Sequence, residues 1–222
     1  MERYLIINPR SGTASPTAEE LRDAAADQGI EVHLLREGED VQDVARAAGA
    51  EVLGMAGGDG SLAAVAEVAL EHDVPFVCVP YGTRNHFARD LGLDRDDPLG
   101  ALAAFRGEER RIDVGRAGDR LFLNNVSLGL YARLVHRREH HRRRRDVFAR
   151  LRALGILIRH PGSLGLTVDG DPIDARILFV GNNRYTLEVF ELGERDRLDE
   201  GLLHLHAAAG LLPTSWDERT GE

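Results

Sequence analysis

Three short glycine-bearing segments contain the residues whose types and spacing could bind phosphate. The most informative is Gly57–Ser61, with the sequence Gly-Gly-Asp-Gly-Ser. Successive glycines let backbone N–H groups converge on one point, and a helix that begins there adds the positive end of its dipole. Asp59 would repel a phosphate unless a divalent cation bridges the two, and Mg²⁺ prefers such oxygen ligands. The segment therefore predicts a phosphate and Mg²⁺ site, or alternatively a tight Asp-Gly turn in which Ser61 caps a helix.

The other two segments are Asn8–Gly12 (Asn-Pro-Arg-Ser-Gly) and Gly82–Asn85 (Gly-Thr-Arg-Asn). Thr83 and Asn85 offer a hydroxyl and an amide to a phosphate or a ribose, and Gly82 permits close approach of the backbone. Each segment alone is a weak signal. Three of them at equivalent strand ends favour a nucleotide site.

Other phosphate and cofactor chemistries fit the sequence less well. All 28 basic residues are arginine, which excludes a P-loop lysine and a Schiff-base lysine. The spacing Gly58-x-Gly60-x-x-Ala63 resembles the dinucleotide fingerprint. That fingerprint requires a carboxylate about 20 residues later, at the end of the next strand, and Val77–Tyr81 has none. Hydride transfer is therefore disfavoured.

The first half of the chain alternates between short apolar runs and helical patterns. Strands are expected at residues 4–7, 32–35, 51–55 and 74–79, and helices at 15–28, 41–48 and 61–70. The first of these helices would have Ser15 as its N-cap and Pro16 as its first residue. The alternation predicts an α/β fold with a parallel sheet covered on both faces, whose ligands bind beyond the carboxyl ends of the strands.

The second half is expected to be rich in β-structure. One hairpin is expected from strands 112–114 and 121–125 around the turn Arg116–Asp119. A second is expected from strands 164–167 and 177–180 around the turn Val168–Asp171, and a further strand at 202–206. The predicted domains are therefore an α/β domain over residues 1–115 and a β-rich domain over residues 116–222.

Composition indicates a soluble, cytoplasmic protein. The chain has 222 residues, 43% of them hydrophobic, and a formal net charge of −9. Its one cysteine, Cys78, fits a reducing compartment. The sequence has no apolar run of about 18 residues and no secretory signal at its start.

The three segments, taken in order with their spacing, resemble the diacylglycerol kinase catalytic-domain family. The third extends through Pro80–Arg89, and Ile112–Gly115 and Phe122–Gly129 are also similar to family segments. The family includes soluble bacterial lipid kinases and the sphingosine and ceramide kinases. It is distantly similar to NAD kinases and phosphofructokinases, so the resemblance implies an N-terminal α/β sandwich of that kind.

The resemblance implies ATP-dependent phosphorylation of a hydroxyl on diacylglycerol or a related lipid, with Mg²⁺. The implied nucleotide and phosphate residues are Asn8, Ser11, Gly12, Gly57, Gly58, Asp59, Gly60, Ser61, Gly82, Thr83 and Asn85. Asp59 would organise Mg²⁺, and Asp113 would lie near the acceptor unless it is only a turn carboxylate. Two alternatives remain: an NAD kinase-like enzyme, and a catalytically silent module that binds nucleotide and membrane.

The sequence departs from the family pattern at three places. The family's Asp-Gly-Glu segment, whose glutamate is thought to be the general base, is not found before Glu222. Asp169-Gly170-Asp171 lies elsewhere, so an incomplete, truncated second domain is expected. His86 stands where the family often has aspartate. The segment Arg197–Leu202 resembles a structural Mg²⁺ site, with Arg197, Glu200 and Leu202 as ligands and Glu200 in place of aspartate.

An arginine-rich stretch, Arg133–Arg152, carries nine arginines against Glu139 and Asp146. It is expected to be a helix that docks on an anionic membrane surface, which would place the protein at the inner face of the membrane. A solvated surface helix is the alternative. Nucleic acid is not an expected partner, because no aromatic platform accompanies the charge. A homodimer is left open.

Overall fold

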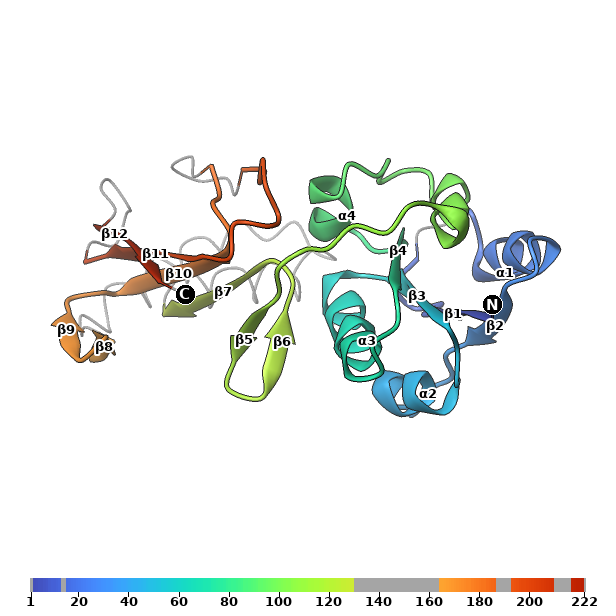
Figure 1. Cartoon of the computed structure of the whole chain (residues 1–222), viewed down its shortest axis with the longest axis horizontal. Helices are drawn as coiled ribbons and strands as arrows, with labels where there is room; N and C mark the ends of the chain where they lie inside the picture. Colours follow the sequence, from blue (N-terminus) through green and yellow to red (C-terminus); the bar gives the residue numbers. More distant parts are fainter. Residues whose placement is uncertain (1, 13–14, 130–163, 187–192, 210–216, 222) are drawn as a thin grey trace, which may run out of the picture. The chain divides into compact units, whose positions relative to one another are not determined.

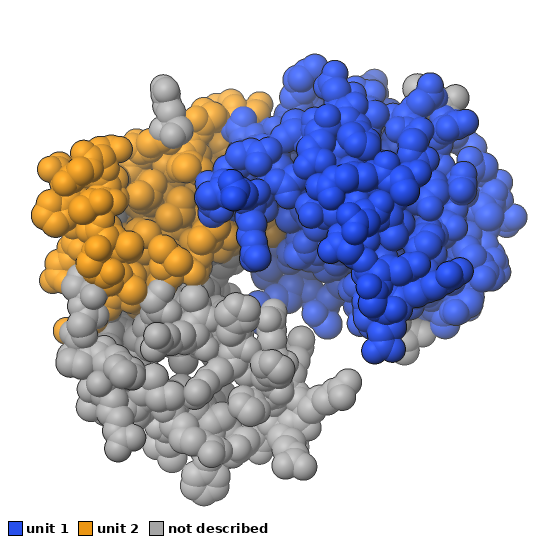
Figure 2. All heavy atoms as spheres, turned by 90° about the horizontal axis from the view of Figure 1, so that it is seen from below, with its two compact units in different colours: residues 1–123 blue, residues 124–222 orange. Residues whose placement is uncertain are grey.

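The computed structural model describes residues 2–12, 15–129, 164–186, 193–209 and 217–221. The chain divides into two units, residues 1–123 and 124–222 (Figure 2). The division falls after residue 123 rather than after the predicted residue 115. The physical reason is that Leu121 and Leu123 are 7% and 3% exposed and belong to the hydrophobic core of the first unit.

The first unit contains a four-stranded parallel sheet in the order β2-β1-β3-β4 (Figure 1). Its strands are β1 (Arg3–Ile7), β2 (Glu31–Leu34), β3 (Val52–Gly57) and β4 (Phe76–Pro80). Ile7 pairs with Ala56 and Gly57 pairs with Pro80, so the last residues of β1, β3 and β4 lie side by side. The predicted parallel α/β sheet is confirmed.

Five helical segments accompany this sheet: α1 (Ala18–Asp27), α2 (Val41–Ala47), α3 (Asp59–Glu71), α4 (His86–Asp90) and the 3-10 helix η1 (Gly100–Arg106). The predicted start of α1 was wrong. The N-cap is Thr17 rather than Ser15, because the Thr17 hydroxyl accepts a hydrogen bond from Glu20 N and the Glu20 carboxylate accepts one from Thr17 N. Helix α3 begins at Asp59, two residues before the predicted Ser61.

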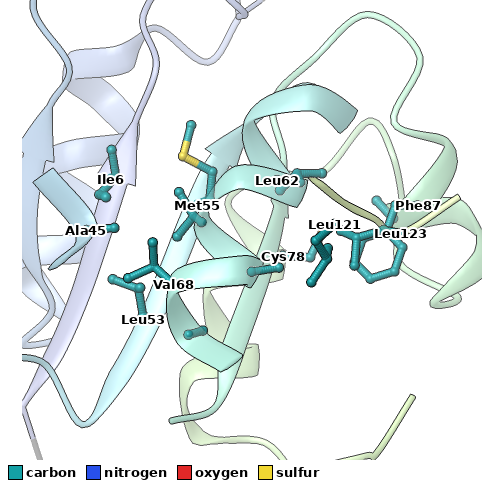
Figure 3. Close-up of a cluster of buried hydrophobic side chains, with 14 of the residues drawn as sticks. Ile6, Ala45, Leu53, Met55, Leu62, Val68, Cys78, Phe87, Leu121 and Leu123 are labelled. Atoms are coloured by element: carbon teal, nitrogen blue, oxygen red, sulfur yellow. The ribbon is translucent and has the colours of Figure 1, made fainter. Parts of the chain in front are cut away.

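Each face of the sheet carries its own hydrophobic cluster, because neighbouring residues on a strand point to opposite faces. One cluster joins Ile6, Met55 and Cys78 of the sheet to the apolar side of α3, and it includes Phe87 of α4 (Figure 3). The opposite cluster joins Leu5, Ile7, Val77 and Val79 to α1 and η1. Burying each of these larger side chains contributes about 1.5–3 kcal/mol, which fixes the strand ends in place.

The second unit contains a four-stranded antiparallel sheet in the order β12-β11-β10-β7. Its strands are β7 (Asn125–Gly129), β10 (Ile177–Asn182), β11 (Leu203–Ala208) and β12 (Asp217–Gly221). The expectation of a parallel α/β part followed by a β-rich part is therefore confirmed. No helix among the described residues is long and apolar enough to cross a membrane.

Two hairpins differ in register from the predicted ones. The first, in the first unit, pairs β5 (Gly115–Ala117) with β6 (Arg120–Phe122), so only Gly118 and Asp119 form its turn. The second pairs β8 (Leu166–Val168) with β9 (Asp171–Ile173), because Asp169 and Gly170 both have positive φ, 53° and 90°, and close a two-residue turn. Residues 177–180, expected in that hairpin, instead pair with β7 and β11.

Candidate functional site

The three glycine-bearing segments lie together at the carboxyl edge of the parallel sheet. They follow β1, β3 and β4, which are neighbours in the sheet. Backbone hydrogen bonds join the starts of these segments: Asn8 N donates to Ala56 O at 2.9 Å, and Tyr81 N donates to Gly57 O at 3.4 Å. The fold therefore brings the predicted segments to one edge, where ligands of such sheets bind.

The second and third segments touch through their backbones at Gly58 and Gly82. A Cβ atom added to Gly82 would lie 2.5 Å from Gly58 Cα and 2.9 Å from Asn85 Oδ1. A Cβ atom added to Gly58 would meet only Gly82 Cα, at 3.9 Å. Gly82 is therefore required by a close backbone approach, whereas Gly58 is not.

Tyr81 connects the first segment to the third. Its ring fills the space that a side chain at position 12 would need, so Gly12 packs directly on the ring. Its hydroxyl donates to Pro16 O at 3.0 Å, and burial raises its pKa. The sequence reasoning did not single out Tyr81, although an aromatic residue directly after a buried strand was a signal for such a role.

Asn85 organises the third segment. It is 5% exposed and has left-handed backbone angles, φ 48° and ψ 44°. Its Oδ1 accepts a hydrogen bond from Gly82 N at 2.8 Å, and its Nδ2 donates to Arg95 O at 3.4 Å. The side chain predicted to contact a nucleotide thus holds the loop closed, while Thr83 is exposed at the surface of that loop.

Asn8 has a similar internal role in the first segment. Its Oδ1 accepts a hydrogen bond from Arg10 N at 3.1 Å, and its backbone oxygen accepts one from Ser11 N at 3.0 Å. These two bonds turn the chain back towards Gly12. Ser11 and Gly12 are half-buried at this edge of the sheet.

A cavity of about 350 Å³ lies beside the third segment. Its walls are formed by Ser15, Pro80, Tyr81, Gly82, Thr83, Arg84, Asn85, Arg95, Asp96 and Pro98. Gly82 lines the cavity and also lies against Gly58, the residue before α3. Asp113 lies between η1 and β5, is half-buried and is not part of the cavity wall.

Helix α3 begins at Asp59, at the segment predicted to bind phosphate. Gly58 is the N-cap and offers no side chain, so the first N–H groups of the helix have no side-chain cap there. The Asp59 carboxylate instead turns to the start of α4. Its Oδ1 accepts from Phe87 N at 3.1 Å and its Oδ2 from His86 N at 3.4 Å. Sequence reasoning missed this link between the two helices.

Two titratable groups, Cys78 and His86, interact electrostatically with Asp59. Burial, followed by the Asp59 charge, raises the pKa of the Cys78 thiol far above its ordinary value. Burial lowers the pKa of His86, although Asp59 opposes that shift. His86 is therefore neutral near pH 7 and adds no charge beside Asp59.

The predicted Mg²⁺ segment lies in the second unit, and its polar groups have partners within the chain. Glu200 Oε2 accepts from Arg184 N at 2.9 Å and lies 3.3 Å from His204 Nε2. Leu202 O accepts from Asn183 N at 3.0 Å, and Arg197 Nε donates to Asp199 at 3.2 Å. Among the described residues, no three His, Cys, Asp or Glu side chains are grouped to hold a metal. A site built largely on backbone carbonyls stays a prediction.

The arginine-rich stretch Arg133–Arg152 lies outside the described residues. Its predicted helix and its predicted docking on a membrane therefore stay predictions based on charge.

Comparison with known proteins identifies the family. Residues 2–117 match the family model of the diacylglycerol kinase catalytic domain, which is slightly more than half of the chain. The chain belongs to this family. A relative from Cronobacter sakazakii, named "Probable lipid kinase YegS-like", is 30% identical over 231 residues, covering 95% of this chain and 76% of that protein.

A second relative matches a shorter stretch, and a solved structure matches most of the chain. A protein of the same name from Pseudomonas fluorescens is 38% identical over 110 residues, 47% of this chain. The match spans about a third, 36%, of that protein's own length. A crystal structure of a diacylglycerol kinase from Bacillus anthracis has a TM-score of 0.62 and 20% sequence identity, covering 93% of this chain and 73% of that one. It supports the fold assignment.

Proposed function

We propose that the protein is an ATP-dependent lipid kinase that transfers the γ-phosphate to a hydroxyl group of diacylglycerol or a related lipid. The observation that carries this proposal is the convergence of three glycine-bearing segments at one edge of the parallel sheet, next to the N-terminus of α3. Membership of the diacylglycerol kinase catalytic domain family supports ATP as the ligand of that edge.

In this proposal the first turn of α3 binds the phosphates. The first backbone donor bonded within α3 is Leu62 N, which donates to Gly58 O, so the N–H groups of residues 59–61 precede the helical hydrogen-bond ladder, and a 13-residue helix concentrates positive potential at that end. Gly57 and Gly58 carry no side chain that would keep a phosphate away. Phosphoryl transfer depends mainly on positioning and on neutralising charge, so backbone donors can supply much of the catalysis without a lysine.

Asp59 is the residue proposed to hold Mg²⁺. A carboxylate has about four lone-pair sites, and the amides of His86 and Phe87 use one on each oxygen. A carboxylate oxygen is the kind of ligand that Mg²⁺ prefers, and the ion commonly binds through one carboxylate, several waters and substrate phosphates. When bound, Mg²⁺ would neutralise the charge that develops on the transferred phosphate. Asp59 would orient the ion while its other lone pairs hold α4 in place.

The remaining predicted residues have supporting roles in the proposal. Ser11 and Gly12 would border the nucleotide from the first segment, and Thr83 would donate its hydroxyl to it from the cavity wall. Asp113 would lie on the side from which the acceptor hydroxyl approaches. The Arg133–Arg152 stretch, with net charge +7, would bind an anionic membrane surface and bring the cytoplasmic protein to its lipid.

Calorimetric titration of ATP tests the nucleotide site. Wild-type protein should bind ATP only weakly without Mg²⁺ and more tightly with it. Asp59→Asn should remove the Mg²⁺ dependence while keeping an acceptor for Phe87 N. Asp43→Asn is the matched control, because the Asp43 side chain is 80% exposed on α2 and belongs to none of the three glycine-bearing segments. Failure of the wild type to bind ATP would refute the proposal.

Transfer of labelled γ-phosphate identifies the acceptor. A lipid extract and NAD are offered separately, and the products are resolved by thin-layer chromatography. Label in the lipid fraction supports the lipid kinase. Label in NAD would mean an NAD kinase-like enzyme instead, and ATP binding without any transfer would mean a nucleotide-binding module.

A further inference from the structure

Two arginines, Arg84 and Arg95, form part of the wall of the cavity beside the third segment. The chain contains no lysine, so arginine is its only side chain that stays cationic at every physiological pH. Asp96 is the acidic residue on the same wall, which leaves a formal charge of +1 among the lining residues. The lining residues of the cavity therefore carry a small net positive charge.

The structure holds Arg95 against the loop that is proposed to bind the nucleotide. Its backbone oxygen accepts from Asn85 Nδ2 at 3.4 Å, and its Nη1 donates to Arg84 O at 3.5 Å. Both bonds run to the third segment, whose geometry Asn85 sets. The guanidinium group is thus placed over the loop while the side chain remains exposed, with most of its N–H donors available to a ligand.

The position of the cavity relates these arginines to a phosphate chain. Gly82 forms part of the cavity wall and lies against Gly58, the N-cap of α3. Gly82 is thus the residue that the cavity wall shares with the contact to the N-cap of α3, whereas residues 57–61 do not line the cavity. A single phosphate could bind either at the first turn of α3 or in the arginine-lined cavity, whereas a chain of phosphates can extend from one to the other.

We propose that Arg95, together with Arg84, binds a phosphate group of the nucleotide in this cavity, and so makes the site selective for nucleotides that carry a phosphate chain. The proposal rests on the proposed function, because it assigns a specificity determinant to the same nucleotide site. A guanidinium group matches two phosphate oxygens at once, and such charge-assisted pairs are among the stronger hydrogen bonds in proteins.

The test compares ATP with adenosine on wild type, Arg95→Ala and Arg95→Lys. Binding is measured by calorimetry, or by competition where it is weak. Arg95→Ala should weaken ATP binding about tenfold or more and leave adenosine binding within about twofold. The ATP affinity of Arg95→Lys should lie between those of wild type and Arg95→Ala, because lysine keeps the positive charge and loses the bidentate geometry. Arg95→Ala should also reduce the salt dependence of ATP binding.

The matched control is Arg120→Ala, an exposed arginine on the β5–β6 hairpin, which should change neither affinity. ATP binding by Arg95→Ala within twofold of wild type would overturn the inference and leave the proposed function standing. Equal losses for ATP and adenosine would also overturn it, because they indicate a collapsed loop rather than a lost phosphate contact. Absence of ATP binding in the wild type would refute the proposed function and this inference with it.

Discussion

The substitution Gly82→Ala would place a methyl group against the backbone of the loop that contains Gly58. The added Cβ would lie 2.5 Å from Gly58 Cα, 3.0 Å from Gly58 N and 2.9 Å from Asn85 Oδ1, where ordinary contacts begin at 3.4 Å. Neither Gly58 atom belongs to a flexible side chain, so the two loops must separate by roughly 1 Å. Overpacking of this kind costs about 1–3 kcal/mol. Weakening the 2.8 Å bond from Gly82 N to Asn85 adds about 1 kcal/mol.

The Gly82→Ala protein should therefore lose about 2–4 kcal/mol of unfolding free energy, and its melting temperature should fall by roughly 5–15 °C. Gly58→Ala is the matched variant, because its Cβ meets only Gly82 Cα, at 3.9 Å, and its backbone angles, φ −85° and ψ 170°, are open to any residue. It should change stability by less than about 0.5 kcal/mol. Urea and thermal unfolding followed by circular dichroism measure both.

The comparison can refute the reasoning in two ways. If Gly82→Ala is as stable as the wild type, the loops yield and the close approach is not a constraint. If Gly58→Ala costs as much as Gly82→Ala, the loss reflects glycine in the loop generally rather than this contact.

Four further outcomes are expected. Asp59→Ala should cost about 2–4 kcal/mol in denaturant unfolding because two α4 amides lose their acceptor, and Asp59→Asn should cost less; equal losses would contradict the capping role. Cys78 should resist thiol reagents at pH 8 until the protein unfolds, because its raised pKa keeps the buried thiol protonated; rapid labelling of folded protein would contradict this. A hydrogen bond from Arg36 N lowers the pKa of Glu39, and one from the Arg46 side chain lowers the pKa of Glu71. The stability that these two carboxylates contribute is therefore present above pH 4.5 and lost as the pH falls below it. Glu71→Gln should flatten this part of the curve of unfolding free energy against pH. Mg²⁺ bound at Arg197, Glu200 and Leu202 should raise the melting temperature in wild type but not in Glu200→Gln, and no rise in wild type would contradict that metal site.

The strand ends and glycine loops could be predicted from sequence because their signals are local. Gly57–Ser61 follows an apolar run of strand length and precedes a helical pattern, so its place at the sheet edge follows from alternation alone. The capping box of Thr17 and Glu20 is equally local in the sequence, but the prediction used Ser15-Pro16, a start signal two residues earlier, and did not consider it.

Other features depend on residues that are distant in sequence. The Asp59 carboxylate accepts the hydrogen bonds of His86 N and Phe87 N, which are 27 and 28 residues away in the sequence. Helix α4 has only five residues, which is too short for a hydrophobic periodicity that would predict the helix. Residues 177–180 fit a hairpin locally, yet β7 and β11 provide pairing on both sides, and only the tertiary fold decides between these partners. Arg95 sits in a short aspartate-rich segment, so its sequence context resembled an ordinary solvated surface.

The Tyr81 ring occupies the space that a side chain at position 12 would need, and this restricts which residues can stand at the two positions in related sequences. A larger residue at position 12 is compatible only with a smaller one at position 81, because the ring already fills the space. That smaller residue would also remove the hydroxyl that bonds to Pro16, so the turn before α1 would need a new support. Substitutions at these positions should therefore occur together among homologous sequences, and either change alone should be rare.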